Sequence, residues 1–252
     1  MIPFYFLKKL YKLKFITYKY LIKPKKAIKS IYGIYLTPAF TDVTFKYYLK
    51  GTYGLFLSNL ISNIDRDTIF VDIGANQGLY SVLAGKNKNI KQVVSFEPSA
   101  KTAKLLRSNI KLNKVNNCTV IEKGISNEAG VLHLNISEGH SGKNTFRQLK
   151  NNDDSTQSET VEIISHKEID KLIPDHRRYF VKIDVEGHEE IVINELVKCS
   201  FFKNVMQIFC EIDAEWVDVS AIKETLSVNG FSNFEKIGNN KTHYDLLISR
   251  TS

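Results

Sequence analysis

Short apolar runs alternate with stretches of helical spacing from about residue 68 onward. The apolar runs are TIFVDIG, KQVVSFEP, NCTVIEKGIS, YFVKIDVEG and NVMQIFCEID, followed near the end by FEKIG and HYDLLIS. Strands that read as continuous apolar runs between helices are typical of a mostly parallel sheet with both faces covered. We therefore expect an α/β fold with a seven-stranded, mostly parallel sheet and helices on both faces.

Two segments interrupt this alternation. VLHLNISEG, residues 131–139, has a period of two and predicts a strand inserted after the third strand of the sheet. RQLKNNDDSTQSET, residues 147–160, is polar and poor in apolar residues, and therefore predicts a surface loop.

Basic residues are concentrated at the start of the chain. Residues 1–50 contain 11 Lys and one acid, Asp42, whereas the other 202 residues contain 24 basic and 26 acidic side chains. Because the body of the chain is near neutral, we expect no nucleic-acid partner. We expect a basic, aromatic-rich helical extension over residues 1–64 and the main domain over residues 65–252.

The extension allows two interpretations. Leu7, Leu10, Tyr11 and Phe15 fall on one helical face, with lysines on another. Such a helix could lie on an anionic membrane surface through residues 1–30, or it could pack on the main domain with its lysines in water. Lysines interrupt the apolar positions throughout, so a secretory signal is not expected.

Composition favours a reducing compartment. The three cysteines are isolated from one another, and no CxxC pair or uncharged apolar run long enough to span a membrane occurs. We therefore expect a cytoplasmic protein, either free or peripheral at the inner face of a membrane. The oligomeric state cannot be read from the sequence.

A glycine turn follows the first apolar run, in FVDIGANQGLY. In open parallel sheets, ligands bind beyond the carboxyl ends of the strands, and glycines there allow a close approach to the backbone. Glu97 ends the second run, 19 residues after Gly78, where a carboxylate can accept hydrogen bonds from both hydroxyls of an adenosine ribose. A dinucleotide site favours GxGxxG, but this chain has Asn76 at the second glycine position. The turn and its acids suit S-adenosylmethionine better than NAD.

The motifs FVDIGANQGLYS, VVSFEPS, LLRSNIKLN, GIS and, above all, VKIDVEGHEE resemble the FkbM-type family of S-adenosylmethionine-dependent methyltransferases. The resemblance extends from about Thr68 to Glu211 and implies a class I methyltransferase fold, which is Rossmann-like. It also implies S-adenosylmethionine as cofactor, a hydroxyl as methyl acceptor, and a glycan, nucleotide-linked or lipid-linked saccharide as substrate. Carried over by position, the cofactor-binding residues would be Asp72, Gly74, Ala75, Asn76, Gly78, Glu97, Pro98 and Ser126.

Methyl transfer to a hydroxyl requires a base near the acceptor, because a hydroxyl is a poor nucleophile. Asp184 ends the fourth strand, Glu186 and His188 follow it, and Glu211 lies near the end of the next strand, all expected at the edge of the sheet where the cofactor binds. We expect His188 to be the general base, because an imidazole titrates near neutral pH. Asp184 is the alternative, with Glu186 and Glu211 orienting the acceptor.

Other features of this edge leave alternatives open. Asp184, Glu211 and Asp213 could hold Mg²⁺ or Ca²⁺, although nothing in their spacing requires a metal. The polar loop EGHSGKNTF, residues 138–146, could contact the acceptor. Two rival functions are a NAD-dependent oxidoreductase and a non-catalytic, membrane-associated binding protein. An S-adenosylmethionine-dependent O-methyltransferase of polysaccharide biosynthesis remains the function that the motifs favour.

Overall fold

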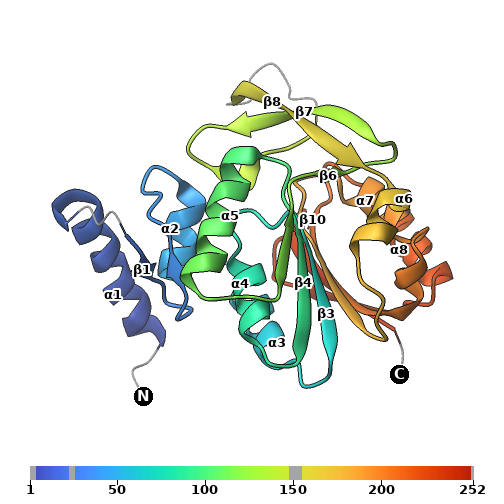
Figure 1. The fold of residues 1–252 in the computed structure, drawn as a ribbon, viewed down its shortest axis with the longest axis horizontal. Coiled ribbons are helices and arrows are strands. Elements are labelled where there is room, and N and C mark those ends of the chain that lie inside the picture. The colour runs from blue at the N-terminus through green and yellow to red at the C-terminus, as the bar shows by residue number, and fades with distance from the viewer. Residues whose placement is uncertain (1–3, 23–25, 148–154, 251–252) are drawn as a thin grey trace.

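A computed structural model describes residues 4–22, 26–147 and 155–250 (Figure 1). Its main sheet has seven strands in the order β11-β12-β10-β9-β3-β4-β5, which confirms the predicted seven-stranded sheet. The strands are β3 (Thr68–Ile73), β4 (Ile90–Phe96), β5 (Cys118–Ile121), β9 (Tyr179–Ile183), β10 (Val205–Asp213), β11 (Asn233–Ile237) and β12 (His243–Ser249).

The sheet is mostly parallel. The pairs β5–β4, β4–β3, β3–β9 and β9–β10 are parallel, whereas β12 runs antiparallel to both β10 and β11. In the register of the central pairs, Ile73 lies opposite both Phe96 and Ile183. The carboxyl ends of β4, β3 and β9 therefore meet at one edge of the sheet, where parallel sheets bind ligands.

Helices cover both faces of the sheet, as predicted (Figure 1). One face carries α3 (Leu55–Ser62), α4 (Leu79–Lys86) and α5 (Ala100–Leu112), and the other carries α6 (His166–Leu172), α7 (Glu189–Leu196) and α8 (Val219–Val228). Each face has its own apolar core. Leu79 and Leu106 belong to the first core, and Val192 and Leu226 to the second.

A second, three-stranded sheet lies beyond the carboxyl edge of the first, in the order β6-β8-β7 (Figure 1). It consists of β6 (Gly124–Ile125), β7 (Gly130–Ser137) and β8 (Ser155–Ile164), and the short helix η2 (Ser141–Lys143) follows β7. The predicted inserted strand at β7 is confirmed. Two expectations are wrong: the GIS segment does not continue the third strand of the main sheet, and residues 155–160 form a strand rather than a loop. Residues 148–154 lie outside the described residues.

The first part of the chain packs on the same face as α4 and α5. It contains α1 (Phe4–Thr17), the π-helix η1 (Tyr18–Ile22), the hairpin β1 (Ile28–Lys29) and β2 (Tyr35–Leu36), α2 (Val43–Lys50), and then α3. Phe15, Leu36 and Phe45 are buried in one apolar cluster with Leu79 of α4.

The apolar residues predicted on one face of the first helix, α1, are partly buried and partly exposed. Phe15 is buried and Tyr11 is half-buried against the domain, but Leu10 is 57% exposed on the outer side. The side chain of Leu7 lies outside the described residues. Within the part of the chain that the structure describes, no helix is both long and apolar enough to cross a membrane.

Candidate functional site

A cavity of about 300 Å³ opens at the carboxyl edge of the main sheet. The ends of β3, β4, β9 and β10 form its floor, and the segment 138–146, η2 included, and residues near α2 form its walls. A volume of this size is typical of a small-molecule site. Of the residues predicted at the site, the cavity is lined by Gly74, Asn76, Glu97, Pro98, Asp184, Glu186, His188 and Glu211.

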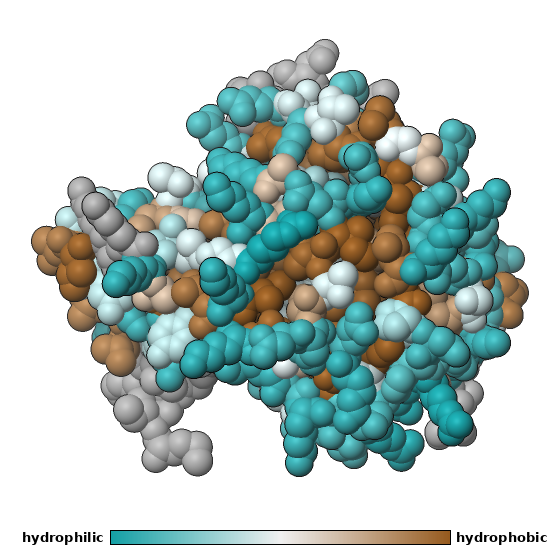
Figure 2. Space-filling view, viewed as in Figure 1, coloured by the Kyte–Doolittle hydropathy of each residue, from teal (hydrophilic) through white to brown (hydrophobic). Residues whose placement is uncertain are grey.

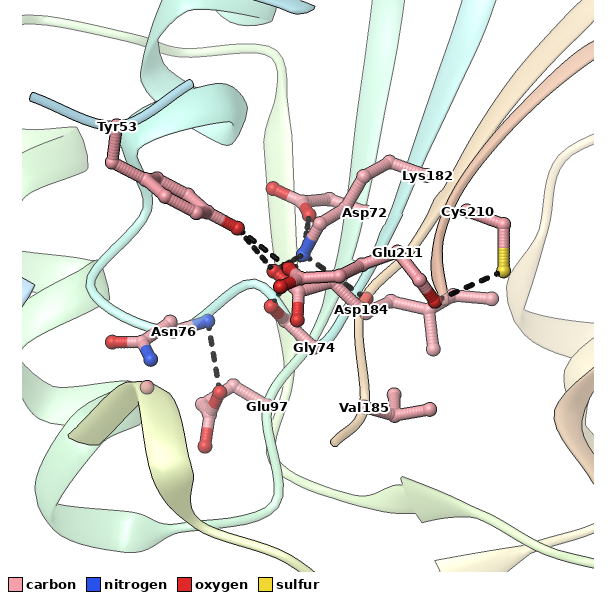
Figure 3. A network of polar contacts seen from close by, with 12 residues as sticks. Tyr53, Asp72, Gly74, Asn76, Glu97, Lys182, Asp184, Val185, Cys210 and Glu211 are labelled. Atoms are coloured by element: carbon pink, nitrogen blue, oxygen red, sulfur yellow. Dashed lines mark hydrogen bonds and ion pairs between the residues drawn. The ribbon is translucent and has the colours of Figure 1, made fainter. Parts of the chain in front are cut away.

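Glu97 lies at one end of this cavity, next to the glycine turn. Its carboxyl oxygens accept a hydrogen bond from the backbone N–H group of Asn76 (2.8 Å), which Figure 3 shows, and another from that of Ser99 (3.0 Å). Asn76 has a φ of +50°, which turns the chain toward Glu97. Burial raises the pKa of Glu97 to about 7, although the two N–H groups oppose the shift. The group thus changes charge near neutral pH.

Asp72, predicted to contact the cofactor, does not line the cavity. Its side chain is fully buried behind the turn, where it accepts a hydrogen bond from the hydroxyl of Ser81 and lies 3.4 Å from the Nζ atom of Lys182. Lys182 in turn donates a hydrogen bond to the carbonyl of Gly74 (2.7 Å). Asp72 therefore supports the glycine turn from beneath, through Lys182.

The glycines of the turn are required by the packing of the chain itself. Gly74 has a φ of +73°, and a Cβ atom there would lie 1.8 Å from the carbonyl oxygen of Asp184. Gly78 has a φ of +85°, and a Cβ atom there would lie 2.3 Å from the side chain of Leu106. Both glycines are therefore needed by the fold itself, and Gly74 also lines the cavity, where a close approach of a ligand to the backbone is predicted. Of the other residues assigned to the cofactor, Ala75, Gly78 and Ser126 do not line it.

Asp184 and Glu211 meet at the other end of the cavity. The hydroxyl of Tyr53 lies 2.7 Å from Glu211 Oε2 and 3.2 Å from Asp184 Oδ2, and Lys182 Nζ lies 3.4 Å from Asp184 Oδ2 (Figure 3). His243, on β12, completes the group with an ion pair of 2.7 Å between its Nε2 atom and Glu211 Oε1. The segment between α2 and α3 and the ends of β9, β10 and β12 thus meet at the pair formed by Asp184 and Glu211.

These contacts shift the pKa values of Asp184 and Glu211 in opposite directions. Burial and the adjacent Glu211 carboxylate raise the pKa of Asp184 well above its ordinary value. Burial acts on Glu211 in the same direction, but hydrogen bonds from His243 and Tyr53 outweigh it and lower the pKa of Glu211. The hydrogen bond to Glu211 raises the pKa of His243 to about 9. At neutral pH, Glu211 and His243 therefore form an ion pair, whereas the raised pKa of Asp184 favours its protonated form.

Glu186 and His188 lie beside this group, after β9. Glu186 has a φ of +54°, its carbonyl accepts a hydrogen bond from Thr145 (2.6 Å), and burial raises its pKa to about 9. His188 lies with its Nε2 atom 3.3 Å from the hydroxyl of Ser126 and its ring against Phe146. Burial lowers the pKa of His188, so its imidazole is neutral at pH 7. Ser126 thus contacts His188.

The loop after β7 is connected to the glycine turn. Ser141 donates a hydrogen bond to Asn76 Oδ1 (2.9 Å) and accepts one from Gln77 Nε2 (3.0 Å). His140, Ser141 and Asn144 all line the cavity, as does Thr44, whose hydroxyl accepts a hydrogen bond from the Gly142 N–H (2.9 Å). The polar loop 138–146 therefore forms a wall of the site.

A metal site is not found among these acids. Across residues 4–22, 26–147 and 155–250, no group of three or more His, Cys, Asp or Glu side chains is arranged to hold a metal ion. The carboxylates are instead engaged by Lys182, Tyr53 and His243.

Sequence reasoning missed Tyr53, Lys182 and His243. Tyr53 belongs to the segment DVTFKYYLKGTYG, which resembles the lead-in segment of the family, and Lys182 lies within KIDVEG. His243 lies in none of the motifs that indicate the family. An antiparallel pairing of the last strand with β10 places it at the same sheet edge as Glu211, and the predicted HYDLLIS strand could have indicated this.

The sheet order and the position of the cavity define the class of the protein. The main sheet is parallel except for one antiparallel strand, β12, inserted near its edge. The cavity lies next to a glycine turn and to the acid that follows the second strand of the motif. This arrangement is a class I, Rossmann-like methyltransferase architecture. The model of the FkbM methyltransferase domain matches residues 72–232. The chain therefore belongs to the FkbM methyltransferase family, as its motifs predicted.

Solved structures with a similar arrangement include several methyltransferases. Ribosomal protein L11 methylase from Lactobacillus delbrueckii subsp. bulgaricus is 13% identical, with a TM-score of 0.46 over 78% of this chain and 77% of that chain. Precorrin-6y C5,15-methyltransferase from Geobacter metallireducens is also 13% identical, with a TM-score of 0.46 over 78% and 87%. TYW2 of M. jannaschii, solved with AdoMet, is 13% identical, with a TM-score of 0.45 over 90% and 86%. Structural similarity at this level does not assign an activity. A search of curated proteins found no significant match.

Proposed function

We propose that this chain transfers a methyl group from S-adenosylmethionine to a hydroxyl of a saccharide, in a glycan or linked to a nucleotide or lipid. The observation that carries the proposal is a single cavity with two chemically different ends: Glu97 and the glycine turn at one, and Asp184, Glu211 and His188 at the other. Family membership supplies the reaction class.

The residues at the first end suit the cofactor. The two backbone N–H bonds fix the Glu97 carboxyl group, and its oxygens retain lone pairs that can accept the ribose hydroxyls. Glu211, whose lowered pKa favours its ionised form, adds negative charge to the same cavity, which suits a cationic sulfonium. When bound, S-adenosylmethionine supplies a methyl group that its sulfonium has already activated.

His188 is our choice for the base that accepts the proton of the acceptor hydroxyl. It lines the cavity, and its lowered pKa keeps the imidazole neutral and able to take up a proton at pH 7. Asp184 is the alternative, although burial and the adjacent Glu211 raise its pKa and so favour its protonated form. In the proposed mechanism, Glu186 and Glu211 orient the acceptor.

The wall formed by α2 and the loop 138–146 has the chemistry that a sugar requires. Thr44, His140, Ser141 and Asn144 present hydroxyl, imidazole and amide groups to the cavity, and the ring of Tyr47 lies among them. Polar groups of this kind match the hydroxyls of a sugar, and an aromatic ring can pack on its apolar face. A saccharide is therefore the acceptor class that these residues favour.

Two measurements test the proposal. Calorimetry should show binding of S-adenosylhomocysteine, whereas NAD should not bind; binding of NAD alone would refute the cofactor assignment. Methyl-labelled S-adenosylmethionine should then label saccharide acceptors, such as nucleotide sugars or extracted glycans, with the wild-type protein. Label that enters protein or RNA but no saccharide would refute the acceptor class and leave the cofactor assignment intact.

A further inference from the structure

The outer side of α1 and η1 exposes many apolar side chains. Six of the fourteen large apolar side chains exposed by the described residues lie between residues 10 and 22. They are Leu10 (57%), Leu13 (62%), Ile16 (46%), Tyr20 (62%), Leu21 (80%) and Ile22 (59%). Figure 2 shows brown side chains at the left edge, at the position of this part of the chain in Figure 1. Scattered apolar residues are normal on a surface, but a cluster marks an interaction site.

Contacts on the inner side of α1 fix its orientation against the domain. The ring of Phe15 is buried and lies 5.9 Å from that of Phe40, which lies 5.4 Å from that of Phe45 on α2. Lys14 Nζ donates a hydrogen bond to the carbonyl of Lys29 (2.9 Å). With these contacts facing inward, the opposite side of α1 faces away from the domain.

Lysines accompany the exposed apolar side chains. Lys9 and Lys12 are exposed on the outer side of α1, and Lys26 and Lys29 are exposed shortly after η1. The first 41 residues contain no acid, and among the described residues up to Lys50 no lysine has an ion-pair partner. Burial and the neighbouring Lys29 lower the pKa of Lys14. This surface therefore carries positive charge that the protein does not neutralise.

We propose that this apolar–basic face, formed by Lys9, Leu10, Lys12, Leu13, Ile16, Tyr20, Leu21 and Ile22, docks on an anionic lipid bilayer. The aliphatic side chains enter the headgroup boundary, and the lysines meet the anionic headgroups. A polyanion such as RNA would satisfy the lysines but would leave Leu13, Ile16 and Leu21 in water. The apolar component thus favours a lipid surface. None of these residues lines the cavity, so docking and cofactor binding are separable.

Co-sedimentation of the full chain with vesicles tests the proposal. Vesicles of phosphatidylcholine with 30% phosphatidylglycerol should bind the protein, and vesicles of phosphatidylcholine alone should bind it weakly. K9Q/K12Q should reduce binding about 30-fold, because each lysine near an anionic surface contributes about a factor of five. The matched control is K101Q/K104Q on α5, which removes two exposed lysines at the same spacing and should leave binding unchanged.

A second pair of variants tests the apolar component. L13S/I16S should reduce vesicle binding by about tenfold or more, whereas V131S/V228S, which changes two exposed valines elsewhere, should not. Cofactor-induced thermal stabilisation should be the same in all four variants, which verifies folding. Absence of binding to anionic vesicles would overturn the proposal. Unchanged binding of L13S/I16S, with displacement of the protein from vesicles by RNA, would also overturn it and indicate a polyanion site.

Discussion

The hydroxyl of Tyr53 donates a hydrogen bond of 2.7 Å to Glu211 across 158 residues of sequence. This contact joins the segment between α2 and α3 to the end of β10. It also leaves Glu211 with one oxygen bonded to Tyr53 and the other to His243. The N-terminal part of the chain therefore takes part in building the end of the cavity that holds Asp184 and Glu211.

We expect Tyr53→Phe to impair turnover more than cofactor binding. The change removes the hydroxyl that contacts both Glu211 and Asp184, at a cost of about 1–2 kcal/mol in stability. The Michaelis constant for the acceptor should rise or kcat should fall, while the dissociation constant for S-adenosylhomocysteine stays the same. Tyr179→Phe is the control, because it removes one tyrosine hydrogen bond, to the Pro174 carbonyl, far from the cavity. Equal kinetics in the two variants would contradict a role for Tyr53 at the site.

Glu97 should make cofactor binding dependent on pH. Its pKa is raised to about 7, so the carboxylate that accepts ribose hydroxyls forms as pH rises through 7. Calorimetry should therefore show S-adenosylhomocysteine binding about tenfold more tightly at pH 8 than at pH 6. Glu97→Gln should bind more weakly and without this dependence, whereas Glu122→Gln, at an exposed ion pair, should keep it. Glu97→Ala should lose about 1.5–3 kcal/mol of binding free energy.

The same group affects the stability of the protein without cofactor. Because burial raises the pKa of Glu97 above its ordinary 4.5, its contribution is fully present below pH 4.5 and is lost as pH rises through about 7. Urea unfolding should show a decline of this kind in the wild type that is smaller in Glu97→Gln. An identical pH dependence in both proteins would argue against a buried, protonated Glu97.

His188→Ala should lower kcat by about 10²–10⁴-fold and leave cofactor affinity unchanged. In the wild type, kcat should fall on the acid side with an apparent pKa below the ordinary 6.5 of histidine, because burial lowers the pKa of His188. That acid limb should disappear in His188→Ala. If it persists there and disappears in Asp184→Asn, the base is Asp184. Ser126→Ala, which removes the hydroxyl beside His188 Nε2, should shift the limb without abolishing turnover.

Gly74→Ala should destabilise the fold severely. The added Cβ atom would lie 1.8 Å from the carbonyl oxygen of Asp184, so β3 and β9 would have to separate at the site. Gly33→Ala is the control: it has a similar φ of +79°, but nothing lies within 4 Å of the added atom. That control should cost about 1–2 kcal/mol for the left-handed conformation alone. A urea titration that gives equal losses for both variants would show that the close approach at Gly74 is unimportant.

The buried elements could be predicted from sequence because they carry an unambiguous pattern. β3, β4, β9 and β10 are continuous apolar runs, and the structure places each where it was expected. β8 was missed at its start because residues 155–160 are polar: the strand lies in the small sheet, where the side chains of Gln157 and Ser158 are exposed to water. The composition of residues 155–160 therefore resembles that of a surface loop.

The residues that line the cavity could be predicted where they end strands, and less well where tertiary contacts decide their position. Glu97, Asp184 and Glu211 line the cavity because the parallel register places their strand ends together. Asp72 lies two residues earlier in the register, opposite Ser95 and Lys182, and its buried side chain pairs with Lys182 beneath the turn. His243 became part of the site only through the pairing of β12 with β10, a long-range contact that no local motif encodes.

Because residue 74 is a glycine, the geometry of one side of the cavity is fixed, and only the other side can vary freely in sequence. Because backbone meets backbone between Gly74 and Asp184, the spacing between the two ends of the cavity is a property of the main sheet. The opposite wall, from Gly139 to Phe146, belongs to a connection between β7 and β8. Sequence changes in that wall can therefore reshape the cavity, while the strand ends that carry Glu97 and Asp184 keep their spacing.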